Sequence, residues 1–184
     1  MIHFIYCQPL WFLTLISAII IICYARLNLL FNNNLWQKIY NFVLLAISIF
    51  VIIYTTILLR EDGNNQIELR PFYTFVMAQN QVEYYRTFFM NILLFVPVGL
   101  NMPYVLSRKP IKINVITTIV FACILSMGIE FAQYYYHLGR CETDDVIANT
   151  LGATVGALSY LLYIRILKNR KENLMESKIT DSQI

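Results

Sequence analysis

The sequence predicts an all-α membrane protein, a polytopic bundle of about five transmembrane helices whose third helix is kinked at Pro97. Hydrophobic residues make up 58% of the 184 positions and charged residues only 14%, whereas a soluble domain carries roughly 25% charged residues. The mean hydropathy is +0.57. Apolar runs of about 20 residues, the length that crosses a bilayer, recur along the chain.

The predicted helices divide the chain into three regions, which are residues 1–66 with two spans, 67–165 with three spans, and a charged cytoplasmic tail at 166–184. The spans themselves are expected at residues 10–30, 39–59, 87–106, 111–137 and 145–164. A long polar connection separates the second span from the third. The other connections are short.

The third span carries Pro97, Gly99 and Pro103. Proline lacks the backbone N–H that a helix needs, so we expect a bend at Pro97. Gly99 permits close contact with a neighbouring helix. In the fifth span, Gly152 and Gly156 form a G-x-x-x-G row, which favours either internal packing or a homodimer.

The orientation follows from the placement of Lys and Arg in short loops. Ten of the 14 basic residues fall in the first and third connections and the tail. They are Arg26, Lys38, Arg108, Lys109, Lys112, Arg165, Lys168, Arg170, Lys171 and Lys178. We therefore expect a multi-pass cell-membrane protein with its N-terminus outside and its C-terminus in the cytoplasm.

With this orientation, several polar residues should meet at the outer leaflet. Polar and ionisable residues in membrane segments are costly and are functional candidates by default. Asp144 and Asp145 also suit the first turn of the fifth span, where an acid can cap the helix. The candidates for a polar network or ligand site are Arg70, Asn91, Glu130, Gln133, Arg140, Asp145 and Asn149.

Three segments resemble VanZ-like membrane proteins. They are NILLFVPVGL at residues 91–100, IEFAQ at 129–133 and RCETDDVIANTLGATVG at 140–156, and LRPF at 69–72 adds to them. The resemblance implies a small bacterial envelope protein, whose namesake is associated with low-level resistance to the glycopeptide teicoplanin. It carries over a residue pattern that includes Pro97, Gly99 and Gly152 but implies no catalytic residues.

Three functions are consistent with these residues. A resistance or envelope protein would bind an anionic lipid-linked wall precursor or a lipoglycopeptide, with Arg70 and Arg140 contacting a phosphate or carboxylate. An intramembrane enzyme acting on such a lipid would use Glu130 with His137 or Asp145 as acid and base. A helix-packing subunit of another envelope protein would use the glycine row.

The sequence indicates the lipid bilayer as a partner and leaves any protein partner unknown. The four cysteines show no metal-ligand spacing, so we expect no metal. We also expect no cofactor and no nucleic-acid partner.

Overall fold

The computed structural model describes residues 34–58, 66–78, 83–106 and 110–181. In these ranges the chain is helical apart from two short strands and their connections. The elements in chain order are α3 (Asn34–Ile53), η1 (Tyr54–Leu58), β1 (Ile67–Glu68), α4 (Tyr73–Ala78), α5 (Glu83–Leu106), α6 (Ile111–Tyr135), β2 (Cys141–Glu142) and α7 (Thr143–Asp181).

Four helical segments within the described residues are long and apolar enough to cross a membrane. They are Leu35–Leu58, Tyr84–Leu106, Ile111–Tyr135 and Thr143–Arg170. They match the second to fifth predicted spans, so the all-α polytopic fold is confirmed. The first predicted span, at 10–30, lies outside the described residues, and the count of five stays a prediction.

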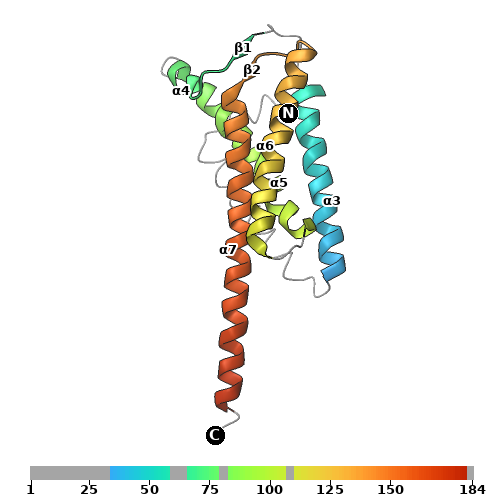
Figure 1. Cartoon of the computed structure of the whole chain (residues 1–184), viewed down its shortest axis with the longest axis vertical. Coiled ribbons are helices and arrows are strands. Elements are labelled where there is room, and N and C mark those ends of the chain that lie inside the picture. Colours follow the sequence, from blue (N-terminus) through green and yellow to red (C-terminus); the bar gives the residue numbers. More distant parts are fainter. Residues whose placement is uncertain (1–33, 59–65, 79–82, 107–109, 182–184) are drawn as a thin grey trace.

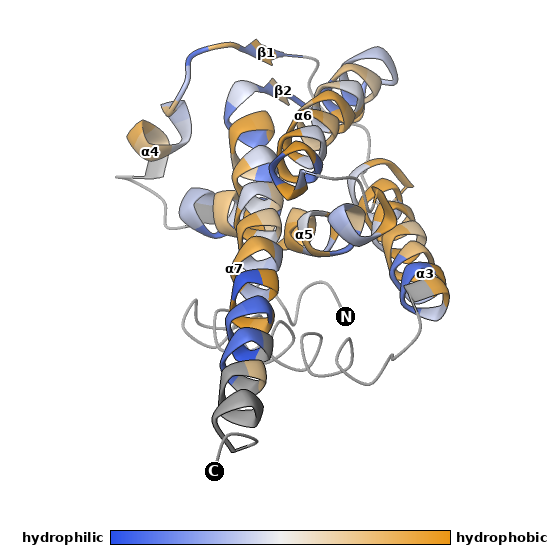
Figure 2. Cartoon of the chain, turned by 60° about the horizontal axis from the view of Figure 1, so that its bottom comes forward, coloured by the Kyte–Doolittle hydropathy of each residue, from blue (hydrophilic) through white to orange (hydrophobic). Residues whose placement is uncertain are grey.

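The helices α3, α5, α6 and α7 run side by side, and β1, β2 and α4 lie together at one end of the bundle (Figure 1). We call this end the strand end. The C-terminal part of α7 projects from the opposite end. Figure 2 shows largely hydrophobic residues on α3, α5, α6 and the first part of α7, and a hydrophilic band further along α7.

Helix α7 continues to Asp181, well past the predicted end of the fifth span at residue 164. Its 39 residues correspond to roughly 58 Å at 1.5 Å per residue, about twice the thickness of a hydrocarbon core. Lys168 and Glu172, one turn apart, form an exposed ion pair of 3.7 Å. Long unbranched residues in this stretch favour helix, which explains why the helix does not end at the membrane.

Glycines bring the backbones of α5 and α7 into close contact. A Cβ atom on Gly152 would overlap the backbone carbonyl of Ile92, and one on Gly99 would overlap that of Ala153. Gly156 is likewise pressed against the α5 backbone. The glycine row therefore packs inside the bundle, as the internal alternative of the sequence analysis describes.

Helix α5 continues through Pro97 and Pro103 without a break. The side-chain amide of Asn101 donates to the Pro97 carbonyl oxygen at 2.6 Å. A bend at Pro97 stays a prediction, because continuity of the helix does not fix its curvature.

Apolar side chains cover the outside of the bundle, whereas several polar ones lie inside it. Along α6, Ile116 and Ile124 are exposed while Asn114, Thr118 and Ser126 are buried. This inverted pattern is expected of a helix in lipid, where polar groups face the protein interior.

Candidate functional site at the strand end

Helix α6 ends at the strand end with a backbone reversal at His137. This residue has a left-handed φ of 57°, the conformation that commonly follows the last helical turn. The Leu138 N–H donates to the Gln133 carbonyl at 2.9 Å, and the His137 N–H donates to the Tyr134 carbonyl at 3.3 Å. These two bonds form a Schellman motif, which directs the following residues back across the end of the bundle.

The returning chain pairs with the segment that precedes α4. Strands β1 and β2 are parallel, with Ile67 opposite Cys141 and Glu68 opposite Glu142. The Cys141 N–H donates to the Gln66 carbonyl at 3.0 Å. This pairing, which the sequence analysis did not predict, brings two distant connections to the same end of the bundle.

The LRPF segment forms a tight turn before α4. The Tyr73 N–H donates to the Arg70 carbonyl at 3.3 Å, and Phe72 takes a left-handed φ of 62°. Proline after the first turn residue and positive φ at the next position are features of a type II turn. A bulky residue with positive φ is uncommon and needs support from the surrounding structure.

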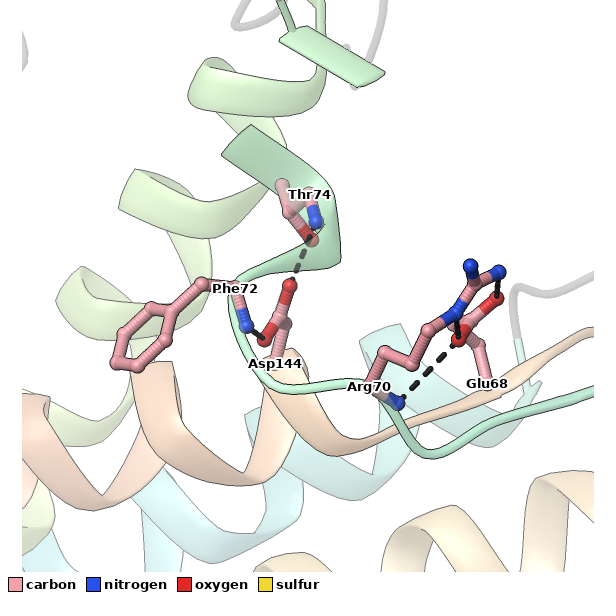
Figure 3. A network of polar contacts seen from close by, with 5 residues as sticks. All are labelled: Glu68, Arg70, Phe72, Thr74 and Asp144. Carbon is pink, nitrogen blue, oxygen red and sulfur yellow. Dashed lines mark hydrogen bonds and ion pairs between the residues drawn. The ribbon is translucent and has the colours of Figure 1, made fainter. Parts of the chain in front are cut away.

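Asp144 supplies that support (Figure 3). Its carboxylate accepts hydrogen bonds from the backbone N–H groups of Phe72 and of Thr74, the latter at 2.7 Å. Asp144 is only 3% exposed. From the sequence, Asp144 is expected to cap its own helix, whereas in the structure it holds the first turn of α4.

Glu130 is buried near the end of α6 and holds β2. Its Oε2 accepts a hydrogen bond from the Glu142 backbone N–H at 2.8 Å. One turn further on, the Gln133 side-chain amide donates to the Thr56 carbonyl oxygen at 3.0 Å. Thr56 lies in η1, the π-helical end of α3. These two side chains thus connect α6 to β2 and to α3.

Arg140 lies between a carboxylate and a phenol. Its Nε is 3.1 Å from a carboxylate oxygen of Glu142. The guanidinium also hydrogen-bonds the Tyr84 hydroxyl, and this contact, more than the nearby Glu142 charge, raises the pKa of Arg140. Tyr84 lies in the first turn of α5, so Arg140 connects the loop after α6 to that helix.

Arg70 has a different environment. It pairs with Glu68 at 2.8 Å, and its side chain is 70% exposed. The hydrogen bond from Arg70 lowers the pKa of the Glu68 carboxyl. The guanidinium also lies 4.2 Å from the centre of the Tyr73 ring. Exposed ion pairs of this kind contribute little stability, so we interpret Arg70 as part of the turn before α4.

A pocket of about 490 Å³ opens at the strand end. Its polar walls come from the two connections and from the beginnings of α4, α5 and α7. The polar residues that line it are Gln66, Thr74, Tyr84, Thr87, Arg140, Glu142 and Asp145. A pocket with a few convergent polar groups is the default hypothesis for a ligand site.

Cys141 lies near three acidic residues beside this pocket. Burial raises the pKa of its thiol, and the charges of Glu130, Asp145 and Glu142 raise it further. A thiolate beside three carboxylates is disfavoured, so Cys141 should be a poor nucleophile at neutral pH.

The structure brings only some of the predicted site residues together. Arg140 and Asp145 line the pocket, and Glu130 lies behind it through its bond to Glu142. Arg70 and Asn91 are not among the lining residues.

Asn149 lies one turn below Asp145 on α7. Its side-chain amide donates to the Ser126 hydroxyl at 2.8 Å, and its Oδ1 has no partner. The Oε1 of Gln133 is likewise buried without a partner. Asn149 and Gln133 therefore join helices within the bundle and are not part of the pocket wall.

The pocket also contains residues that the sequence analysis did not select. Thr74 comes from α4, within the long second connection, and Tyr84 comes from the first turn of α5. Nothing in the sequence marks them, because their role depends on the pairing of β1 with β2. Glu142 lies two residues after Arg140 in the sequence, and this proximity was the one signal that could have identified it.

Within the described residues, no group of three or more His, Cys, Asp and Glu side chains could hold a metal ion.

Sequence comparison with known proteins identifies the family of this chain. The sequence family described as VanZ/LLP1 matches residues 11–166, which include every residue of the pocket. The chain belongs to the VanZ/LLP1 family. It is also 28% identical over 87 residues to Protein VanZ of Enterococcus faecium.

That second match covers 47% of this chain and 52% of the Enterococcus protein. The aligned part is thus about half of the relative's length. No solved structure matches the chain. The expected VanZ-like identity is confirmed, and the protein is a multi-pass membrane protein of that family.

Proposed function

We propose that this VanZ-family protein binds a lipid-linked or lipid-tailed anionic ligand at the outer leaflet and thereby gives low-level resistance to teicoplanin. The ligand would be a cell-wall precursor or the lipoglycopeptide itself. The protein would act by binding, without changing the ligand covalently.

The observation that carries this proposal is the position of Arg140 in the pocket wall. Its guanidinium side chain is 35% exposed, so it can reach a ligand while Tyr84 and Glu142 hold it in place. Guanidinium groups bind phosphate and carboxylate through charge-assisted hydrogen bonds. The four apolar helices beside the pocket would place a lipid tail in the bilayer while the headgroup reaches Arg140.

The outward orientation of the strand end rests on the distribution of basic residues. The opposite end carries Lys112 at the start of α6, and Arg165, Lys168 and Arg170 along α7. Basic residues accumulate on the cytoplasmic side of membrane proteins. The strand end would then face the compartment in which glycopeptides and lipid-linked wall precursors meet.

A susceptibility test in a sensitised host examines the proposal. Expression of the wild-type chain should raise the teicoplanin concentration that stops growth, and Arg140→Ala should return it to the level of the empty vector. Arg70→Ala, which removes an arginine outside the pocket, is the matched control and should behave as the wild type. Full resistance in Arg140→Ala at equal membrane abundance would contradict the proposal.

An intramembrane enzyme is the second candidate, favoured by the two buried acids near the pocket. Glu130 is 3% exposed and Asp145 is 9% exposed, and desolvation is one way to prepare a carboxyl group for acid–base work. Purified protein incubated with a labelled lipid-linked precursor distinguishes the two. Conversion of the label that stops in Glu130→Gln would favour the enzyme, and an unchanged label with retained binding would favour the binding protein.

The third possibility, a helix-packing subunit built on the glycine row, receives no support from the bundle interior. Gly152 and Gly156 already pack against α5 of the same chain. A partner would have to use another face.

A further inference from the structure

The charges in the pocket are not those of a site for a simple anion. Its wall contains one guanidinium, from Arg140, and two carboxylates, from Glu142 and Asp145. Arg140 already lies 3.1 Å from Glu142. A ligand that offered only a phosphate or carboxylate would have to approach Arg140 beside two like charges, which disfavours its binding.

The position of Asp145 also disfavours a simple anion and favours a cation. It lies in the first turn of α7 and is 9% exposed, so water screens its charge only partly. Asp145 also lies close enough to Cys141 for its charge to raise the pKa of the thiol. A cationic group bound in the pocket would be stabilised by Asp145 and Glu142 together.

Aromatic residues complete the environment for a cation. Tyr84 and Phe88 line the pocket from the first turns of α5. Phe75 packs edge-on against Phe88 with ring centres 5.0 Å apart, which fixes the Phe88 ring. Ring faces attract ammonium groups, and the attraction is larger where water is excluded.

We infer that the pocket selects a zwitterionic headgroup, in which an ammonium group and a phosphate or carboxylate belong to the same molecule. The anion would contact Arg140, and the ammonium would lie between Asp145, Glu142 and the aromatic wall. This inference rests on the proposed function and narrows its ligand class. An aminophospholipid headgroup and the free amino end of a peptide share this chemistry.

The test uses the full chain in an uncharged detergent and titration calorimetry. Dihexanoyl phosphatidylethanolamine and dihexanoyl phosphatidylglycerol carry the same tails and phosphate, and only the first carries an ammonium group. Alanylalanine and its N-acetylated form make the same comparison for a peptide. The ammonium-bearing member of at least one pair should bind roughly tenfold or more tightly than its anionic counterpart, the gain expected of a hydrogen bond to a charged group.

Two variants assign that preference to the pocket. Asp145→Asn and Glu142→Gln should each reduce the preference severalfold and leave the anionic probes bound as well as before or better. Glu68→Gln removes a carboxylate outside the pocket and should retain the preference. The Glu142 side chain is 21% exposed, so Glu142→Gln should unfold thermally as the wild type does. This variant therefore tests the inference even if the more buried Asp145→Asn does not fold.

The outcomes separate the inference from the function beneath it. If an anionic probe binds the wild type as tightly as its ammonium-bearing partner, and Arg140→Ala abolishes that binding, the zwitterion inference is overturned and the anion-binding function stands. If none of the four probes binds, the zwitterion inference is overturned, and the susceptibility test with Arg140→Ala alone decides the proposed function. Preference in the phospholipid pair alone would assign the lipid headgroup, and preference in the peptide pair alone would assign the peptide.

Discussion

Replacement of Asp144 should release α4 from the bundle. The Asp144 carboxylate accepts the backbone N–H groups of Phe72 and Thr74, and it is 3% exposed. A hydrogen bond to a charged group contributes about 1.5–3 kcal/mol. Losses of two bonds to one carboxylate are not additive, so we expect Asp144→Ala to destabilise the attachment of α4 by about 3 kcal/mol.

Asp144→Asn provides the graded comparison. Its amide keeps one acceptor oxygen but loses the charge and the second acceptor, so the expected loss is about 1.5 kcal/mol. Since every 1.4 kcal/mol corresponds to a factor of about ten, amides of α4 should exchange with solvent roughly 100-fold faster in Asp144→Ala and roughly tenfold faster in Asp144→Asn.

Hydrogen exchange followed by mass spectrometry on the detergent-solubilised protein measures this directly. Peptides from the middle of α6 serve as the internal control, because Asp144 does not contact that part of the bundle, and they should exchange at the wild-type rate. Exchange in α4 that is unchanged in Asp144→Ala would refute the assignment of Asp144 as the residue that holds this turn. Acceleration throughout the protein would instead indicate global unfolding.

Three further predictions concern packing, the thiol and the buried amide. Gly152→Ala should lower the free energy of unfolding by about 1–3 kcal/mol or more, the usual cost of overpacking, because its Cβ would overlap the Ile92 carbonyl. Gly128→Ala is the control and should be neutral or slightly stabilising, because nothing lies within 4 Å of the added Cβ. A variant with Cys141 as its single cysteine should react with iodoacetamide only at a higher pH than a free thiol does, because burial and three carboxylates raise the Cys141 pKa. An alkylation profile that coincides with that of a model thiol would contradict this environment. Gln133→Leu should destabilise the protein by about 1–3 kcal/mol through the unpaired Thr56 carbonyl; a melting temperature equal to that of the wild type would show that this contact is unimportant.

The fold was largely predictable because hydrophobic length carries most of the information in a membrane protein. Apolar runs placed the second to fifth spans, and the glycine pattern identified the surface through which α7 contacts α5. The predicted end of the fifth span at 164 marks where the apolar run ends, and α7 continues past it to Asp181. Beyond that residue the chain is polar but still favours helix, so hydropathy predicts the edge of the membrane and not the end of α7.

The candidate site was predictable only in part. Arg140 and Asp145 were identifiable because charged residues beside apolar segments are conspicuous. Arg70 was equally conspicuous, yet its partner is the nearby Glu68, a local pairing that spacing alone could not distinguish from a ligand contact. Tyr84 was not predictable, because its contact with Arg140 depends on the reversal after α6 and on the pairing of β1 with β2.

The most direct test of the central claim is the binding of radiolabelled lipid-linked wall precursor and of teicoplanin to the purified protein, compared between Arg140→Ala and Arg70→Ala. If the pocket at the strand end is the ligand site, the wild type and Arg70→Ala should bind at least one of the two ligands alike. Arg140→Ala should bind that ligand roughly tenfold or more weakly, the expected effect of losing a charged hydrogen bond. Equal binding by Arg140→Ala, or a loss confined to Arg70→Ala, would contradict the assignment of the site.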